Sequence, residues 1–397
     1  MEQVLNLSFK LVVKLVTIVL LSFVFVACST KKVEKATLII PPPPEEPKIF
    51  YIDTYEGSNT FEETKALDIF IGKESAMAAG RLAKPYGVNG IGDKMYVADS
   101  AVGVVFVFDT KSKKVTMLGD KSEGKLMSPT GIAHDSNNNV YVSDTKLKKV
   151  YGYSPEGKLI FAIGKKNELR RPTGLAINRK LNRLYVVDTK AHDIKVYSLD
   201  GKQLFKFGKR GTSAAGDFNF PTNIAIDSRN GNVVVSDTQN FRVQIFDKDG
   251  EFINKFGQIG DRAGMFARPK GIAVDTEGHI YIADAAFNHI QVFDDKGRLL
   301  IYFGGHWQKT PGTFIQLSGL NIDENDKIYI VDGLRGAVQV FQYVSEEWKR
   351  KNPQEYKKLK EYKPKKVKKV EKIERVPLDI PSQFPREEKL EKDMLKF

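Results

Sequence analysis

Six aspartates end runs of the type Tyr-Val-Ala-Asp along this chain, at intervals of 44 to 49 residues. They are Asp99, Asp144, Asp188, Asp237, Asp284 and Asp332. Carboxylates can hold metal ions or act as general acids and bases, so a ring of them could do chemistry. Six equivalent copies instead favour a structural part, in which each carboxylate caps the backbone turn after its strand. We therefore predict that these aspartates belong to the scaffold.

Histidines are the other candidates for chemistry, because convergent imidazoles could hold a catalytic metal. They are His134, His192, His279, His289 and His306. They fall at unlike positions of the repeat: His279 in a turn, His134 near the end of an innermost strand, and the others in loops. No three share an equivalent inner position. The sequence therefore predicts no catalytic residue, metal site or cofactor.

The elements that must position these residues are short strands. Each period contains four apolar runs, and the fifth copy shows them most clearly, at residues 271–275, 279–284, 289–294 and 298–304. Clusters of Asp, Asn and Gly separate the runs and close tight turns. Four strands joined in this way form an antiparallel meander that is apolar on both faces. A period of this length, made of strands alone, predicts the blades of a β-propeller.

Family signatures mark the same periods. A proline precedes the first strand of most copies, at Pro85, Pro129, Pro172, Pro221 and Pro269. The repeated patterns are Pro-x-Gly-Ile-Ala-x-Asp, Tyr-Val-x-Asp and Arg/His-x-Gln-Val-Phe-Asp. By these residues, the stretch 49–344 resembles the NHL-repeat family of six-bladed propellers. The resemblance implies an all-β fold of six four-stranded antiparallel blades. Similar propellers include lyases and lactonases with a metal in the central channel, and extracytoplasmic sensor or scaffold domains.

Closure of the ring requires one more strand. The sixth copy supplies three strands and ends at Tyr343, so the fourth must come from the N-terminal side. We predict that residues 49–53 provide it, with residues 67–72 as the alternative. In either case the two ends of the propeller are joined in one sheet, which removes a free sheet edge.

The N-terminus has the pattern of an export signal. Lys10 and Lys14 precede an uncharged run, 15–27, that is too short for a comfortable membrane span. The run ends at Cys28, the only cysteine, in a pattern that resembles the bacterial lipoprotein box, where the cysteine is acylated. We predict a signal peptide over 1–27 and a lipid anchor at Cys28. The alternatives are an uncleaved anchor helix and an ordinary secretory signal. All three place the propeller outside the cytoplasmic membrane, in the cell envelope, and at the outer membrane if the bacterium has one.

Two unrepeated segments flank the propeller. Residues 28–48 are polar and proline-rich and are expected to form an extended linker. Residues 345–397 carry 17 Lys or Arg against 11 Asp or Glu, part of a net charge of +13. We expect this tail to be extended beyond a helix near 346–362. Its charge would suit an anionic surface, or alternatively only solubility; export argues against nucleic acid as a physiological partner.

Strand direction sorts the connections between strands onto two faces. The turns after first and third strands lie on one face, here the turn face, and the loops after second and fourth strands lie on the other, the loop face. The loop face collects basic and aromatic residues, a composition typical of interaction surfaces. The predicted partner-binding residues are Lys146, Lys148, Lys149, Lys190, His192, Phe241, Arg242, Phe287, His289, Trp307 and Arg335.

These observations favour a binding function. We expect an envelope-tethered propeller that docks a protein or an anionic envelope polymer through its loop face, with the N-terminal lipid as its membrane contact. The alternative is a metal-dependent enzyme of the lyase or lactonase type. A third hypothesis is a purely structural role in the envelope.

Overall fold

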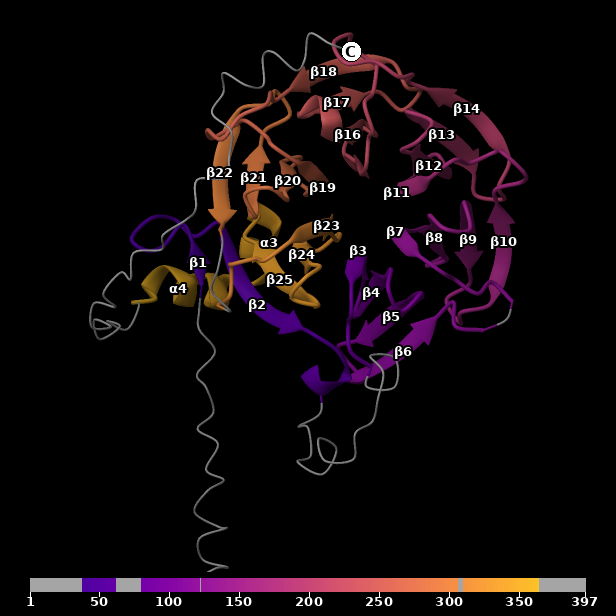
Figure 1. Cartoon of the computed structure of the whole chain (residues 1–397). Coiled ribbons are helices and arrows are strands. Elements are labelled where there is room, and N and C mark those ends of the chain that lie inside the picture. Colours follow the sequence, from indigo (N-terminus) through magenta and orange to yellow (C-terminus); the bar gives the residue numbers. More distant parts are fainter. Residues whose placement is uncertain (1–37, 62–79, 122, 306–309, 364–397) are drawn as a thin grey trace, which may run out of the picture. The chain divides into compact units, whose positions relative to one another are not determined.

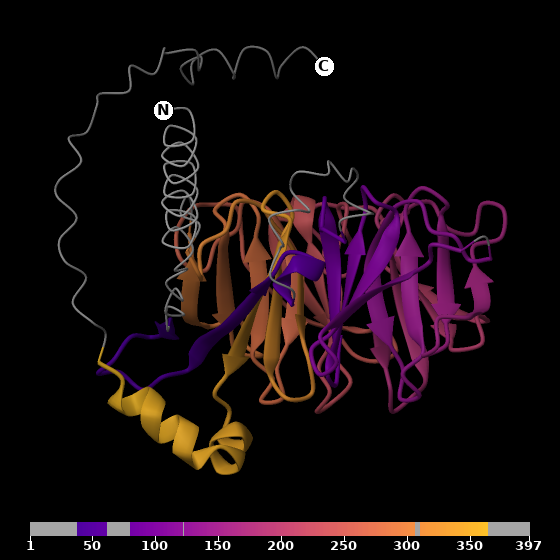
Figure 2. The same ribbon diagram turned by 90° about the horizontal axis from the view of Figure 1, so that it is seen from below.

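The six repeats form six antiparallel sheets around a common axis in a computed structural model that describes residues 38–61, 80–121, 123–305 and 310–363 (Figure 1). The prediction of an all-β, six-bladed propeller is therefore confirmed. All six sheets belong to the unit Met1–Lys360; a second unit comprises Glu361–Phe397. The strands run between the two faces of the ring, the turn face and the loop face (Figure 2).

Five sheets follow the chain in order, each with its first strand nearest the axis. Blade 1 contains β3 (Pro85–Ile91), β4 (Lys94–Asp99), β5 (Val104–Asp109) and β6 (Lys114–Leu118). Blade 2 contains β7 (Pro129–His134), β8 (Val140–Asp144), β9 (Lys149–Tyr153) and β10 (Leu159–Ile163). Blade 3 contains β11 (Pro172–Asn178), β12 (Arg183–Asp188), β13 (Asp193–Ser198) and β14 (Gln203–Phe207). Blade 4 contains β15 (Ile224–Ile226), β16 (Val233–Asp237), β17 (Arg242–Phe246) and β18 (Phe252–Phe256), with a short 3₁₀ helix, η2 (Thr238–Asn240), between β16 and β17. Blade 5 contains β19 (Pro269–Val274), β20 (Ile280–Asp284), β21 (His289–Phe293) and β22 (Leu299–Gly304).

Blade 6 joins the two ends of the ring. It contains β23 (Leu317–Ile322), β24 (Lys327–Asp332) and β25 (Ala337–Tyr343), and its fourth strand is β2 (Ile49–Tyr55), which is followed by η1 (Ser58–Thr60). Pairing of Ile49 with Tyr343 confirms the predicted closure by residues 49–53. The alternative strand, 67–72, lies outside the described residues.

One part of the linker prediction is wrong. Residues 38–48 do not form an extended stalk, because β1 (Ile39–Ile40) pairs with β2 and makes this sheet five-stranded. The Lys48 amide also donates to the Ile40 carbonyl at 2.9 Å, and Pro47 is buried. Without β1, the outer edge of β2 would present unpaired backbone groups, which a covering strand satisfies.

Glycines of the Pro-x-Gly signature let neighbouring blades approach closely at the axis. A Cβ atom added to Gly87 would lie 1.9 Å from the Thr130 carbonyl oxygen of the next blade, and one at Gly319 would lie 2.3 Å from the Tyr86 carbonyl oxygen. Backbone carbonyls cannot move aside without shifting their strands, so a side chain here would push the blades apart. The signature is thus a packing requirement of the ring.

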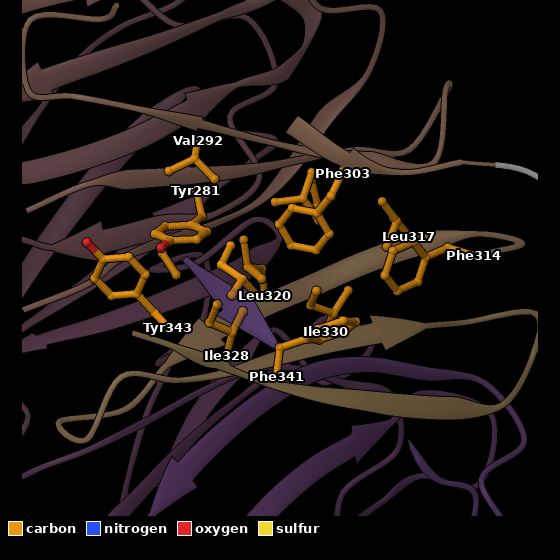
Figure 3. Packing of buried hydrophobic residues seen from close by; sticks show 14 of the residues in the cluster. Tyr281, Val292, Phe303, Phe314, Leu317, Leu320, Ile328, Ile330, Phe341 and Tyr343 are labelled. Carbon is orange, nitrogen blue, oxygen red and sulfur yellow. The ribbon is translucent and has the colours of Figure 1, made fainter. Parts of the chain in front are cut away.

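The hydrophobic core lies between blades, as Figure 3 shows for blades 5 and 6. Tyr281 and Phe303 from blade 5 pack with Leu320, Ile330 and Phe341 from blade 6. All five are buried. Each sheet has apolar residues on both faces because each face meets a neighbour, and no blade could bury both faces alone.

Two helices follow the last blade, close to the helical stretch predicted for the tail: α3 (Glu346–Lys351) and α4 (Pro353–Glu361). Pro353 separates them because it disfavours helical backbone at the residue before it. Both helices contact the N-terminal segment, since Lys349 Nζ lies 2.8 Å from Glu46 Oε1 and the Tyr356 hydroxyl donates to it at 2.7 Å. These hydrogen bonds, Lys349 first, lower the pKa of Glu46 to about 2. No helix within the described ranges is long and apolar enough to cross a bilayer.

Candidate functional site

A cavity of about 390 Å³ follows the axis of the ring and is lined by the first strands of all six blades. It extends to the turn face, where the connections after these strands border it. Aliphatic side chains line much of it, among them Ile177, Ile226, Val274 and Ile322. A cavity of this size, with apolar walls and a few polar groups, can accommodate a small organic ligand.

Four polar residues connect across the turn-face end of this cavity. His134, the last residue of β7, has its Nδ1 2.5 Å from Asn89 Oδ1 in blade 1. Its Nε2 accepts a hydrogen bond from Arg179 Nη2, in the turn after β11. The Arg179 guanidinium also pairs with Glu324 at 3.2 Å. The connection therefore runs from blade 1 through blades 2 and 3 to blade 6.

The protonation state of His134 follows from its partners. Arg179 can only donate, so Nε2 must carry the lone pair, which leaves the proton on Nδ1 to be donated to Asn89. Burial first and the charge of Arg179 second lower the pKa of His134 to about 3. The imidazole is thus neutral at pH 7 and adds no positive charge to the cavity.

The opposite, loop-face end of the axis carries a basic ring. We use this name for Lys84, Arg171, Arg268 and Lys270, which flank the prolines that begin β3, β11 and β19. The first three belong to alternate blades and are exposed. Lys270 is partly buried, and its Nζ lies 5.9 Å from the centre of the Tyr86 ring. Within the part of the chain that the structure describes, no acidic side chain pairs with any of the four.

Electrostatics show that the members of the basic ring act on one another. Burial, and then the charges of Arg268 and Lys84, lower the pKa of Lys270. Burial also raises the pKa of the Tyr86 hydroxyl, and Arg171 opposes that rise. Two basic residues from different blades therefore repel the Lys270 ammonium, so an anion placed among them would be favoured.

The repeated aspartates hold this ring in place. Asp99 accepts from the Lys84 amide at 2.9 Å, Asp188 from the Arg171 amide at 2.8 Å, and Asp284 from the Arg268 amide at 3.1 Å. Asp99 also accepts from the amides of the turn after its strand, at Ala101 and Val102. The predicted capping of the following turn is confirmed for Asp99, Asp144, Asp284 and Asp332, whereas Asp188 and Asp237 pair with Lys195 and Arg242. Asp99, Asp144, Asp188 and Asp284 also accept from the amide of the residue that precedes a proline.

The predicted loop-face residues differ in accessibility. Lys146, Lys148 and Lys190 are exposed, and Lys149 is partly buried. Three other partly buried residues make contacts of their own: the rings of Phe287 and His289 are stacked at 5.6 Å, and Arg335 Nε lies 3.7 Å from Glu56. Phe241 is also partly buried. Cys28 and Trp307 lie outside the described residues.

Two of those predictions, His192 and Arg242, are wrong as regards exposure, because both side chains are buried. Arg242 pairs with Asp237 at 2.8 Å and donates to the carbonyl oxygens of Ser213, Ala214 and Asp217, which orders the long loop before blade 4. His192 Nδ1 accepts from the Phe220 amide at 3.2 Å. The side chains are directed inward because these loops have unpaired carbonyl and amide groups to satisfy.

Metal binding would need several convergent donors. Among the described residues, no three His, Cys, Asp or Glu side chains lie close enough together to hold an ion. The cavity residues His134 and Glu324 are separated by Arg179, whose charge opposes a cation. The donor set seen at the axis therefore does not fit a metal centre.

Sequence reasoning missed the residues at both ends of the axis. Asn89, Arg179 and Glu324 join His134 only through strand packing, and the basic ring was left out of the predicted loop-face set. A signal was present in the repeat itself. The fourth residue of the Gly-Ile-Ala-x-Asp pattern reads Gly90, His134, Ile177, Ile226, Val274 and Ile322. His134 is the only polar side chain at this position.

Comparisons with known proteins agree with this fold. The family model of the teneurin NHL domain matches residues 110–314. No curated protein sequence matches the chain. A solved protein of unknown function from Bacteroides thetaiotaomicron is 17% identical over 66% of this chain and 70% of its own, with a TM-score of 0.55. A gluconolactonase from Xanthomonas campestris is 18% identical over 66% and 86%, with a TM-score of 0.50. Virginiamycin B lyase from Staphylococcus aureus is 13% identical over 74% and 99%, with a TM-score of 0.49. At these identities the structural likeness concerns the fold alone.

Proposed function

We propose that this chain, which belongs to the teneurin NHL domain family of NHL-repeat propellers, is a binding module. In this proposal it docks an anionic polymer of the cell envelope on its loop face. The basic ring is the centre of the docking surface, and the exposed Lys146, Lys148 and Lys190 extend it outward. A lactonase with the same fold at 18% identity carries no reaction over to this chain.

The observation that carries this proposal is the unpaired charge of the basic ring. Lys84, Arg171 and Arg268 come from alternate blades, so they surround the axis instead of forming one lateral patch. Lys270 between them is partly buried, with an aromatic ring but no carboxylate as its described neighbour. Burial of a cation without an acidic partner reduces stability, and such an arrangement is typical of a binding site whose ligand supplies the missing charge.

Binding to dextran sulfate and to neutral dextran tests the proposal, because the two polymers share a backbone and differ in charge. We expect the full-length chain to bind dextran sulfate, more weakly as salt is raised, and not dextran. The variant Lys84→Glu with Arg268→Glu should lose at least about tenfold in affinity, since two favourable charge contacts become repulsive. The matched control, Lys111→Glu with Lys202→Glu, makes the same charge change at exposed turn-face residues.

The control should lose no more than about twofold to threefold in affinity, through net charge alone. Equal losses in the two variants would contradict a docking site at the basic ring and leave only the general charge of the chain, including its lysine-rich tail. A protein recovered through the same ring, with no polymer binding, would identify the partner as a protein instead.

The envelope location is a separate part of the proposal, which the pattern around Cys28 supports. Acylation at this cysteine would tether the propeller to a membrane through lipid chains. Metabolic labelling with a fatty acid should mark the wild-type chain and not Cys28→Ser. Label that persists in Cys28→Ser would rule out this site.

A further inference from the structure

The turn-face end of the axial cavity departs from the repeat in several blades at once. His134 stands where three other blades have isoleucine and one has valine. Its partner Asn89 stands where four blades have alanine. Polar substitutions at apolar repeat positions cost stability unless they are used, because the ring would pack more simply with aliphatic side chains.

Arg179 spans the mouth of this cavity. It lies in the turn after β11 of blade 3, and its partner Glu324 lies in the turn after β23 of blade 6, on the opposite side of the six-bladed ring. A second, outer hollow of about 440 Å³ adjoins the mouth, and of the residues that the structure describes only His134, Arg179 and Glu324 line both spaces. These three side chains therefore form the boundary between the cavity and the outer hollow.

The ion pair at this boundary is weak enough to be exchanged. The side chains of Arg179 and Glu324 are 37% and 66% exposed, and exposed pairs of this kind contribute little to stability. His134 contacts the guanidinium through a neutral imidazole, which does not neutralise the positive charge of Arg179. A guanidinium has five N–H donors in a planar fork that fits a carboxylate. A ligand carboxylate inside the cavity could therefore compete with Glu324.

From this geometry we propose that the axial cavity binds a small organic carboxylate, whose carboxylate group replaces Glu324 on Arg179 while its body lies against the aliphatic walls. His134, held by Asn89, fixes the guanidinium at the mouth as a positioning residue. Ile177, Ile226, Val274 and Ile322 provide the apolar contacts. The site is on the face opposite the basic ring and is independent of the polymer docking proposed above.

Ligand-observed NMR on the full chain tests this site with acetate, benzoate and 4-phenylbutyrate, each paired with its neutral amide. We expect the acids to bind, most tightly those with an apolar body, and the amides to bind at least about tenfold more weakly. Arg179→Gln should reduce binding of the acids by about tenfold or more. Glu324→Gln should strengthen it about twofold to fivefold, because the competing carboxylate is gone.

Lys202→Gln is the matched control, since Lys202 is an exposed cation on the turn face that does not line the axial cavity. It should leave the affinity unchanged, as should Lys84→Gln on the loop face. The proposal is overturned if none of the three acids binds, if acids and amides bind equally, or if Glu324→Gln weakens binding. It is also overturned if Arg179→Gln, with its fold intact by circular dichroism, binds as the wild type does.

Discussion

The two ends of the central channel are built from the same repeat but treat charge in opposite ways. At the turn face, three basic groups have acidic partners: Arg179 pairs with Glu324, Arg229 with Asp227 at 2.7 Å, and His279 with Asp275 at 2.9 Å. At the loop face, the basic ring has no described acidic partner. Paired charges consolidate a fold or close a site, whereas unpaired charges of one sign attract a ligand of the other.

Arg242 gives the sharpest test that loop-face cations are not all alike. It is buried, and removing it would leave the buried Asp237 carboxylate without its paired cation and would take one donor from each of three backbone carbonyl groups. Arg242→Leu should therefore lower the free energy of unfolding by about 3–5 kcal/mol. Urea denaturation measures the loss, with exposed Lys190→Leu as the control. A change below about 1 kcal/mol would place Arg242 with the unpaired ring.

His134 should make stability depend on pH. Its folded pKa of about 3 lies below the ordinary value of 6.5, so only the unfolded chain takes up its proton as the pH falls below 6.5. The free energy of unfolding therefore decreases as the pH falls below 6.5, by about 1.4 kcal/mol per pH unit. Between pH 6.5 and 5, the free energy of unfolding measured by urea denaturation should decrease more steeply for the wild type than for His134→Ile. Parallel pH profiles would show that the imidazole is free to protonate.

Removing the charge of Lys270 should stabilise the fold, whereas removing the paired cation Arg242 should destabilise it. Burial of its ammonium, and then repulsion by Arg268 and Lys84, lower its pKa. Lys270→Met keeps the length of the side chain and removes the charge, so it should raise the free energy of unfolding by about 1 kcal/mol while weakening dextran sulfate binding. Thermal unfolding and the binding assay together measure both effects. Destabilisation by Lys270→Met would mean that the charge supports the fold.

The ion pair across the turn-face mouth should have the smallest effect on stability. A double-mutant cycle of Arg179→Gln and Glu324→Gln should give a coupling energy of about 0.2–1 kcal/mol, as expected for an exposed pair. The same substitutions are expected to change ligand affinity far more than stability. A coupling above about 2 kcal/mol would indicate a rigid clasp and not an exchangeable contact.

Prediction from the sequence succeeded where one residue pattern recurs. The proline at each first strand, the aspartate at each second strand and the glycine between blades repeat because the same local geometry repeats, so six copies support one inference. Closure by residues 49–53 was also predictable, since the sixth copy lacked a strand. The cover provided by β1 was not, because Ile39–Ile40 follows no repeat and gains its role only from the edge of β2.

Site prediction succeeded less well because exposure and pairing depend on neighbours distant in the sequence. Arg242, at the start of β17, and Lys148, just before β9, are both cations on the loop face, yet one is buried against carbonyl groups and the other is exposed. His134 was correctly placed near the end of an innermost strand, but its partners Asn89, Arg179 and Glu324 are far apart in the sequence.

The amino-acid sequence by itself determined the number of blades, the strands within them and the place where the ring closes, because these follow from local patterns repeated along the chain. Only the tertiary structure decided which charges are neutralised and which remain for a ligand. Closing six blades around one axis brings residues from opposite blades into contact, and it separates the two ends of the channel into a basic ring and a bridged cavity.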